Sequence, residues 1–331
     1  MIRIGLLGAG RIGQIHGRNV AAHQAARLAA VADAVPEAAA ALARTTGAQA
    51  LGTEELIGAK DIDAVMICTS TDTHADFIER AARTGKAIFC EKPIDLSARR
   101  IAETLRKTDA AGVKLMVGFN RRFDPNFAEL RKRLAAGAVG EVEIVSIISR
   151  DPSPPPLDYV RRSGGLFRDM MIHDFDMARF LMGEEPVEVQ AMGSSLVDAR
   201  IAEAGDVDTA VVQMRTASGK LCQISNSRRA VYGYDQRAEV HGSKGLLRAG
   251  NIHETTLEQA SAKGFTADPL QNFFLERYAL AYRLELDAFL GVVRSRRAPS
   301  PSGHDGLKAQ LLADAATKSA RSGKPVRVAL G

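Results

Sequence analysis

The first third of the chain alternates short apolar runs with segments of helical spacing. Apolar runs occupy residues 2–7, 28–33, 62–70, 86–93 and 114–120. The stretches between them, including the alanine-rich segment 36–47, carry apolar residues at helical intervals. Because the runs are continuous rather than alternating, each strand is expected to be covered on both faces. The pattern predicts βαβ units and an open parallel sheet.

The pattern changes after residue 123, where strands dominate. A helix expected over residues 126–136 leads to strands near 140–150, 188–192, 209–216, 220–227, 236–242 and 245–249. Tight turns at 217–219 and 242–245 predict a large, mainly antiparallel, open-faced sheet. Helices are expected over 170–182, 275–294 and 306–322. We therefore predict an α/β protein with an N-terminal domain at 1–120 and a C-terminal α+β domain at 121–331.

The composition is that of a core-forming protein, with 331 residues, 46% of them hydrophobic and 25% charged. A net charge of +5, no tryptophan and only 5% aromatic residues offer no base-stacking platform, so no nucleic-acid partner is expected. Cys68, Cys90 and Cys222 lie far apart without a CxxC pair, so we expect reduced thiols in a cytoplasmic protein and no metal site. The chain starts with a strand rather than a signal peptide, and no apolar run approaches the roughly 20 residues that span a bilayer.

A GxGxxG motif formed by Gly8, Gly10 and Gly13 follows the first strand and opens a helix. Asp33 lies twenty positions after Gly13, where the second strand ends. This context is the dinucleotide-binding fingerprint of a Rossmann domain, in which the glycines admit the pyrophosphate at a helix N-terminus. The alternative is a glycine-rich turn that binds no ligand.

Asp33 is expected to hydrogen-bond the adenosine ribose and to repel a 2′-phosphate, so we predict NAD rather than NADP. Arg11, within the phosphate loop, is the one residue nearby that favours NADP. The third strand ends at the carboxyl edge, where ligands bind in open α/β sheets. The residues expected to line the cofactor there are Thr69, Ser70, Thr71 and His74. Helix capping by Ser70, Thr71 or Asp72 is the competing interpretation.

Asp169 and His173 are four positions apart, which places them on one face of a predicted helix. A surface ion pair, a buried structural histidine or a metal ligand would each account for the pair. Acid–base catalysis is a further explanation, because a neutral histidine oriented by a carboxylate can accept a hydroxyl proton near pH 7. The stretch "FCEKP" raises a similar question, since Lys92 after the fourth strand is either a surface ion-pair partner of Glu91 or part of an active site.

The glycine fingerprint, Glu91-Lys92-Pro93, and Gly164-Gly165 followed by Asp169 and His173 resemble the Gfo/Idh/MocA oxidoreductase family. The resemblance covers nearly the whole chain. The stretches "GFNRRFDPNF" at 118–127, "SRDPSPPP" at 149–156 and "YGYDQRAEVHGSKG" at 232–245 are most similar to its inositol 2-dehydrogenases.

The resemblance implies roles for residues that the pattern alone does not assign. Lys92 would donate a hydrogen bond to the reacting oxygen, His173 would be the general base, and Asp169 its partner. The bond between Lys92 and Pro93 is expected to be cis, as in the family. The positions that match the cofactor pocket are Gly8, Gly10, Arg11, Ile12, Asp33, Thr69, Ser70, Thr71, His74, Glu91, Lys92 and Asn120. Those that match the substrate pocket are Lys92, Arg121, Asp151, Asp169, His173 and Tyr234.

Two of these assignments have simpler alternatives. Arg121 and Arg122 would otherwise be a solvated pair at a helix start. Tyr232 and Tyr234 would otherwise share one face of a strand.

The resemblance also implies the reaction, which is NAD-dependent oxidation of myo-inositol to 2-keto-myo-inositol (scyllo-inosose). A dehydrogenase of scyllo-inositol or of an aldose, and an inactive NAD-sensing regulatory protein, are the alternatives. The second-domain sheet carries apolar residues on both faces, so we expect a homo-oligomer, a tetramer formed through that sheet as in the family.

Overall fold

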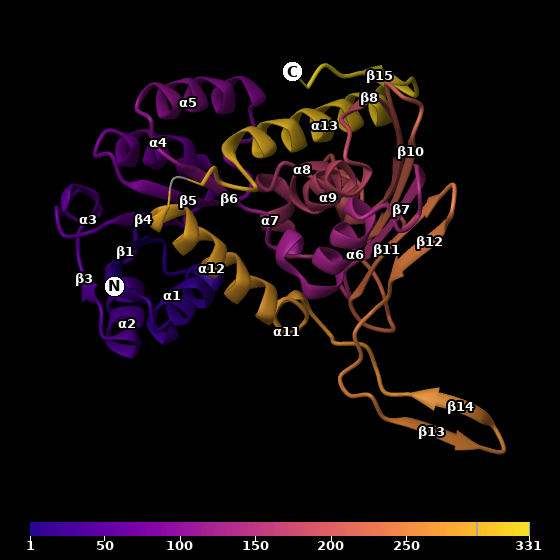
Figure 1. The fold of residues 1–331 in the computed structure, drawn as a ribbon, viewed down its shortest axis with the longest axis horizontal. Coiled ribbons are helices and arrows are strands. Elements are labelled where there is room, and N and C mark those ends of the chain that lie inside the picture. The colour runs from indigo at the N-terminus through magenta and orange to yellow at the C-terminus, as the bar shows by residue number, and fades with distance from the viewer. Residues whose placement is uncertain (296, 331) are drawn as a thin grey trace. The chain divides into compact units, whose positions relative to one another are not determined.

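The computed structural model describes residues 1–295 and 297–330 and contains two compact units (Figure 1). The first unit comprises Met1–Phe123 and Ala281–Gln310, and the second comprises Asp124–Leu280 and Leu311–Gly331. The continuous division at residue 120 that the sequence suggests therefore differs from the observed one. A C-terminal segment returns to the first unit because Leu286, Phe289 and Leu290 complete its hydrophobic core.

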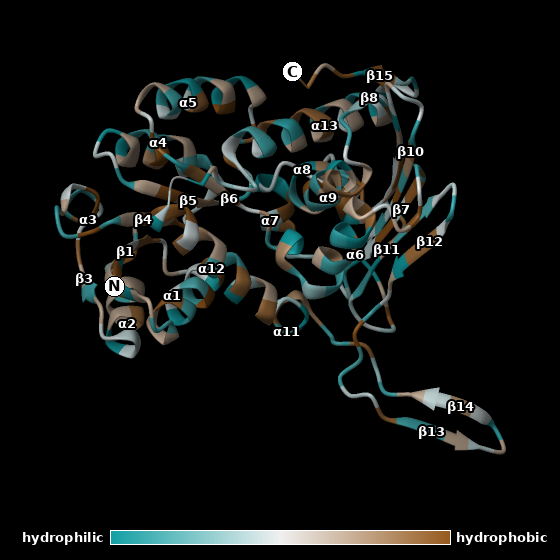
Figure 2. Cartoon of the chain, viewed as in Figure 1, coloured by the Kyte–Doolittle hydropathy of each residue, from teal (hydrophilic) through white to brown (hydrophobic). Residues whose placement is uncertain are grey.

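The first unit is built on a six-stranded sheet in the order β3-β2-β1-β4-β5-β6. Every pair in this sheet is parallel, as predicted. Its strands are β1 (Ile2–Leu7), β2 (Ala26–Ala32), β3 (Gln49–Ala50), β4 (Ala64–Ile67), β5 (Ala87–Glu91) and β6 (Leu115–Gly118). Only β3, with two residues, is absent from the expected set. Strand β4 is buried at every residue, as expected for a strand covered on both faces, and Figure 2 shows the central strands in hydrophobic tones.

Helices cover both faces of this sheet, with α1, α2 and α12 on one side and α4 and α5 on the other (Figure 1). Their bounds are α1 (Arg11–Ala22), α2 (Pro36–Thr46), α3 (Thr53–Gly58), α4 (Thr71–Ala82), α5 (Ala98–Ala110), the 3-10 helix η1 (Asn120–Phe123) and α12 (Ala279–Arg294). Local signals set several ends. Proline occupies the first position of α2, Gly47 ends it with a φ of 70°, and the Ser97 hydroxyl accepts a hydrogen bond from the Arg100 amide at the start of α5.

The second unit contains a seven-stranded sheet in the order β12-β11-β7-β10-β9-β8-β15. Its strands are β7 (Val142–Arg150), β8 (Pro186–Ser194), β9 (Thr209–Thr216), β10 (Leu221–Ser227), β11 (Asp235–Gly242), β12 (Gly245–Ala249) and β15 (Val326–Arg327). All pairs are antiparallel except β7 with β10, which agrees with the predicted mainly antiparallel sheet. In β9, buried residues such as Val212 alternate with exposed ones such as Val211.

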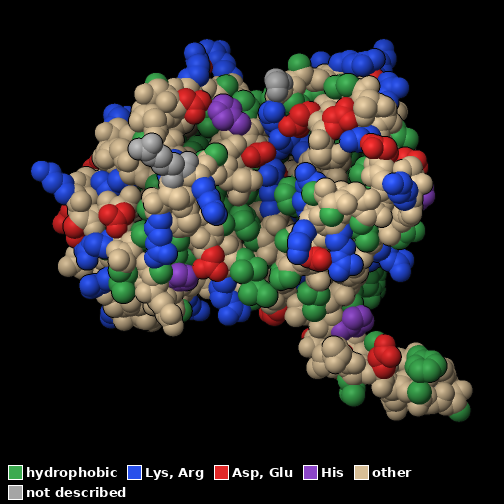
Figure 3. Space-filling view, viewed as in Figure 1, with side chains coloured by type: hydrophobic (Ala, Val, Ile, Leu, Met, Phe, Trp, Pro, Cys, Tyr) green, Lys and Arg blue, Asp and Glu red, His purple; other side chains and the backbone are tan. Residues whose placement is uncertain are grey.

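Helices of the second unit pack on one face of this sheet, and α9 contacts both β7 and β10. The helices are α6 (Pro125–Ala135), α7 (Leu157–Arg162), α8 (Leu166–Asp169), α9 (Ile172–Met182), α10 (Ala199–Glu203), α11 (Phe274–Arg277) and α13 (Gly303–Ser322), whose first turns belong to the first unit. A hairpin of β13 (Glu258–Ser261) and β14 (Gly264–Ala267) extends away from the sheet, and Figure 3 shows apolar side chains on it. No helix within the described ranges is long and apolar enough to cross a bilayer.

One local expectation and one alternative interpretation were wrong. The helix predicted through Asp169 and His173 is broken, because α8 ends at Asp169 and α9 begins at Ile172. Tyr232 and Tyr234 do not share a strand face, because both precede β11; Tyr232 is 48% exposed and Tyr234 only 5%. The turn glycine Gly233, with a φ of 115°, breaks the alternation that the sequence suggested.

Candidate active site

The turn between β1 and α1 needs glycine for two different reasons. At Gly8 the backbone φ is 96°, and an added Cβ would lie 2.4 Å from the Cys68 carbonyl oxygen. At Gly13 a Cβ would lie 2.0 Å from the Gly8 carbonyl oxygen. At Gly10 a Cβ would meet nothing within 4 Å, so this glycine faces open space at the N-terminus of α1. The cradle therefore has room for a pyrophosphate beside the free amides of the helix.

Asp33 follows β2 and is tied to the same turn. Its Oδ2 accepts a hydrogen bond from the Ala9 amide at 2.6 Å, and its Oδ1 accepts one from the Val35 amide at 2.8 Å. A carboxylate has about four lone-pair sites, so the two backbone bonds leave capacity for ribose hydroxyls. The acid is therefore fixed at the edge of the cradle, in the position that the fingerprint requires.

The segment after β4 contributes hydroxyls and a buried histidine. The Thr69 and Thr73 hydroxyls lie 2.6 Å apart, and Ser70 is the N-cap residue of α4 without a capping bond from its side chain. His74 is 2% exposed, with Nδ1 2.8 Å from the Pro93 carbonyl oxygen and Nε2 3.0 Å from the Thr69 carbonyl oxygen. Burial lowers the pKa of His74. The histidine thus joins the end of β4 to the turn after Lys92, and its contact with a cofactor stays a prediction.

Lys92 follows the last residue of β5, and the Lys92–Pro93 bond is cis. The preceding Glu91 pairs with Gly118 of β6 and is 8% exposed, with Oε1 2.7 Å from His16 Nε2. The explanation of Glu91 as a surface residue is therefore wrong. Strands β1, β4, β5 and β6 are neighbours and parallel, so Lys92 lies at the same carboxyl edge as the glycine cradle.

The segment after β6 contributes three further polar residues to the first unit. Asn120 and Arg121 are 4% and 6% exposed on η1. Arg122 forms an ion pair of 3.0 Å with Asp305. Neither arginine is a solvated residue at a helix start, so the simpler alternative for this pair is wrong. Asn120 and Arg121 thus lie just beyond the carboxyl end of β6, at the edge that carries the cradle.

In the second unit, Asp169 stands at the end of α8 within a polar network. Its Oδ1 accepts a hydrogen bond from the Tyr159 hydroxyl at 2.8 Å, and its Oδ2 lies 3.5 Å from Arg228. Arg228 is 1% exposed and also lies 4.0 Å from Asp206, whose pKa is raised by burial. His173 lies in the first turn of α9, one helix beyond Asp169. The network therefore fixes the carboxylate predicted to act beside His173.

The sheet of the second unit brings two further predicted residues to one end. Arg150 of β7 pairs with Asp235 of β11, so Asp151 and Tyr234 follow and precede paired strand ends. The Asp151 amide also donates to the Ser227 carbonyl at 3.0 Å, beside the end of β10. Tyr234 packs against the rings of Tyr278 and Phe273, with centroids 6.0 and 6.3 Å away.

Sequence reasoning missed several residues that hold these groups. Tyr159 and Arg228, which contact Asp169, lie 10 and 59 positions away from it along the chain. His16, which contacts Glu91, lies three positions after Gly13, and this helical spacing was the only local signal for it. None of these contacts follows from a motif, because each depends on how separate elements pack.

A parallel sheet in the order 3-2-1-4-5-6, a glycine cradle after its first strand and an acid after its second define a dinucleotide-binding protein. A sequence model described as "Oxidoreductase family, NAD-binding Rossmann fold" matches residues 2–119, and one described as "GFO/IDH/MocA C-terminal domain" matches residues 127–248. The chain belongs to the Gfo/Idh/MocA family of oxidoreductases, and its cofactor is NAD.

Individual relatives match over the full length. The inositol 2-dehydrogenase of Rhizobium meliloti (strain 1021) is 55% identical over 328 residues, covering 99% of each chain. The crystal structure of a myo-inositol dehydrogenase from Corynebacterium glutamicum ATCC 13032 superposes with a TM-score of 0.96 at 45% identity, covering 99% of each chain. The scyllo-inositol dehydrogenase from Lactobacillus casei, solved with bound NAD(H) and scyllo-inositol, superposes with a TM-score of 0.92 at 29% identity, also covering 99% of each.

Proposed function

We propose that this protein oxidises myo-inositol to 2-keto-myo-inositol with NAD as the acceptor. The observation that carries the proposal is Lys92 at the carboxyl edge of an NAD-binding sheet, in a chain 55% identical to an inositol 2-dehydrogenase. The polar network around Asp169 supports an acid–base role for His173, which lies in the first turn of the next helix.

The reaction breaks one C–H bond and one O–H bond of the ring and forms one C=O bond. His173 accepts the hydroxyl proton, and Asp169 orients the imidazole and stabilises its positive form. Lys92 donates a hydrogen bond to the reacting oxygen, which stabilises the negative charge that develops there. When bound, NAD supplies the hydride acceptor.

Polar side chains suit a substrate with a hydroxyl on every ring carbon. We assign substrate contacts to Lys92, Arg121, Asp151, Asp169, His173 and Tyr234. A site built to hydrogen-bond hydroxyl groups discriminates strongly against analogues that lack them, because its own polar groups are then left unpaired. We assign cofactor contacts to Gly8, Gly10, Arg11, Ile12, Asp33, Thr69, Ser70, Thr71, His74, Glu91, Lys92 and Asn120.

Alanine substitutions test the catalytic roles. Lys92→Ala, Asp169→Ala and His173→Ala are each expected to lower kcat/KM for myo-inositol by about 100-fold or more, while NADH binding persists. Matched controls are Asp158→Ala and His304→Ala, whose side chains are 87% and 58% exposed; both are expected to leave kcat/KM unchanged. Near-normal activity of any of the three site variants would contradict the role assigned to that residue.

A polyol panel with NAD and NADP, followed by absorbance of the reduced cofactor, tests the substrate. We expect the highest kcat/KM with myo-inositol and NAD. A preference for scyllo-inositol or an aldose would reassign the substrate within the same chemistry. Intact NADH binding without turnover of any polyol would replace the dehydrogenase by an NAD-sensing protein.

The open face of the second-unit sheet supports a homo-oligomer. Its exposed apolar residues fall into neighbouring strands, where Leu221 pairs with Ile144 and Met192 pairs with Val211. These four side chains are between 41% and 65% exposed. We propose that this face joins subunits of a tetramer, and sedimentation as a monomer at micromolar concentration would refute it. We also propose a cytoplasmic location, supported by three free cysteine thiols.

A further inference from the structure

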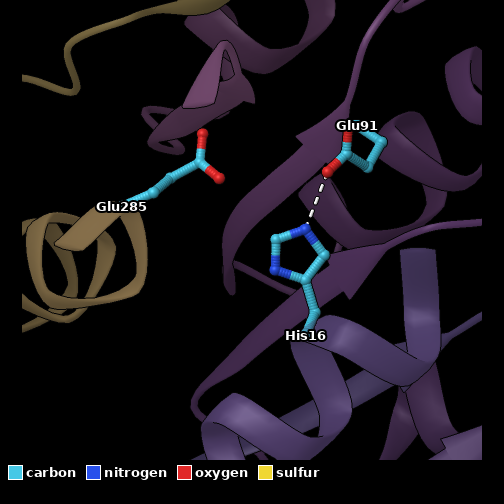
Figure 4. A group of neighbouring side chains, drawn as sticks. All are labelled: His16, Glu91 and Glu285. Atoms are coloured by element: carbon cyan, nitrogen blue, oxygen red, sulfur yellow. Dashed lines mark hydrogen bonds and ion pairs between the residues drawn. The ribbon is translucent and has the colours of Figure 1, made fainter. Parts of the chain in front are cut away.

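Three ionisable side chains meet in the core of the first unit. His16 comes from α1, Glu91 from the end of β5 and Glu285 from α12, and Figure 4 shows their polar ends turned toward one another. They are 1%, 8% and 0% exposed. His16 Nε2 lies 2.7 Å from Glu91 Oε1. One polar atom each of His16, Glu91 and Glu285 lie within 4.8 Å of one another.

The charges of this cluster do not balance if both carboxyl groups are ionised. A protonated His16 would neutralise one carboxylate, and the second would be left buried without a counter-ion. Both oxygens of Glu285 and Nδ1 of His16 are buried and have no hydrogen-bond partner among the residues that the structure describes. An ionised carboxylate that is buried without a hydrogen-bond partner is strongly disfavoured, and such a group usually takes up a proton instead.

Two buried thiols lie close to the cluster and add no charge to it. Cys68 and Cys90 both interact electrostatically with Glu91, and burial raises the pKa of each thiol well above its ordinary value. The rings of Phe89 and Tyr282 pack against His16 with centroids 5.0 and 5.5 Å away. Burial, and then the charge of Glu91, likewise raise the pKa of Glu285 well above its ordinary value.

The cluster joins the segments that carry the cradle and the catalytic turn. His16 lies on the helix that starts at the glycine cradle, and Glu91 immediately precedes Lys92. On the other side of Glu91, a Cβ at Gly118 would lie 2.8 Å from its Oε2, so this carboxylate is held between β6 and the cluster.

We propose that Glu285 holds a buried proton beside the His16–Glu91 pair, and that this cluster positions the Glu91–Lys92 turn for catalysis. The second half of this statement rests on the proposed dehydrogenase function. The first half does not, because the proton can be detected without any turnover. Glu285 and His16 are thus positioning residues that act through Glu91.

The proton is tested by thermal unfolding of the full-length protein from pH 5 to pH 9. A folded protein that holds a proton which the unfolded chain releases loses stability as pH rises. Glu285→Gln removes this penalty, so its Tm advantage over the wild type should grow with pH. Glu79→Gln is the control, because Glu79 is also buried but is paired with Arg100 and Lys107, and its Tm difference should stay constant above pH 6.

A Tm difference for Glu285→Gln that does not change with pH overturns the buried proton on Glu285. So does a divalent metal found in stoichiometric amount in the purified protein by mass spectrometry and lost in Glu285→Gln, since the cluster would then be a metal site.

The positioning role is tested with kcat for myo-inositol and Kd for NADH. Glu285→Leu should lower kcat by about 10- to 100-fold, with Kd for NADH largely unchanged, and Glu285→Gln should restore kcat. Leu290→Ala, in the same helix and 2% exposed, should lower Tm without lowering kcat. If Glu285→Leu does not fold, His16→Phe replaces it in this test. His16→Phe keeps an aromatic ring at this position and should show the same loss of kcat.

Wild-type kcat in Glu285→Leu or His16→Phe overturns the positioning role, as does an equal loss in Leu290→Ala. If the wild type oxidises no polyol, the dehydrogenase proposal fails, and the unfolding experiment still decides whether the proton is present.

Discussion

Replacing Gly10 by alanine separates nucleotide binding from folding. Gly10 has a φ of −69°, which alanine adopts without strain, and its added Cβ would meet no atom within 4 Å. The same Cβ would project into the space before α1, whose first intrahelical hydrogen bond runs from the Gln14 amide to the Gly10 carbonyl at 2.9 Å. The amides that precede Gln14 in the helix point at that space and are the groups that a pyrophosphate would use.

Gly10→Ala is expected to raise the stability of the fold and to lower the affinity for NADH. A glycine-to-alanine change at a compatible site stabilises a protein by about 0.4–1 kcal/mol, because the unfolded chain loses freedom. Two lost hydrogen bonds to a charged phosphate cost about 3–6 kcal/mol, at about 1.5–3 kcal/mol each. That loss corresponds to a Kd for NADH that is raised by about two to four powers of ten.

Thermal unfolding and titration of NADH fluorescence on the same preparation measure both effects. Gly8→Ala is the matched control, because its positive φ and the 2.4 Å approach to the Cys68 carbonyl should lower Tm as well as affinity. A Gly10→Ala protein of wild-type stability that binds NADH with wild-type affinity would refute the assignment of this cradle to the pyrophosphate.

Four further outcomes are expected. Between pH 5 and the raised pKa of Glu285, each pH unit should add about 1.4 kcal/mol to the stability advantage of Glu285→Gln in urea unfolding, and a flat difference contradicts the shift. Asp33→Ala should raise the ratio of kcat/KM with NADP to that with NAD; an unchanged ratio removes Asp33 from cofactor selection. Arg228→Met should destabilise the protein by about 3–5 kcal/mol, since it leaves two carboxylates without their buried cation, whereas the exposed Arg229→Met should not. Leu221→Glu should shift sedimentation toward smaller species; an unchanged coefficient places the subunit interface elsewhere.

The sequence alone specified the parallel sheet and its ligand edge. Continuous apolar runs followed by glycine or polar turns are local signals, and they identified five of the six strands together with the cradle at Gly8, Gly10 and Gly13. The position of Lys92 at the carboxyl edge follows from strand order, which βαβ connectivity strongly restricts. These features are predictable because each depends on residues close together in the chain.

Side-chain partners were decided by the tertiary structure. The spacing of Asp169 and His173 indicated a shared helix face, yet the helix is interrupted between them, and Tyr159 and Arg228 contact the Asp169 carboxylate. The spacing of apolar residues predicts which face of a helix or strand is buried. It does not predict which other element packs against that face.

Helix α12 likewise has a type that the sequence predicts and a position that only packing decides. The apolar residues of α12 predict that the helix packs against a hydrophobic core, but they do not say which one. Only the tertiary structure shows that Leu286 and Phe289 complete the core of the NAD-binding unit. The same packing brings Glu285 to His16 and Glu91 across more than 190 residues of sequence. "FCEKP" thus identified the turn that carries Lys92, whereas the buried partners of Glu91 depend on contacts between segments that no local pattern encodes.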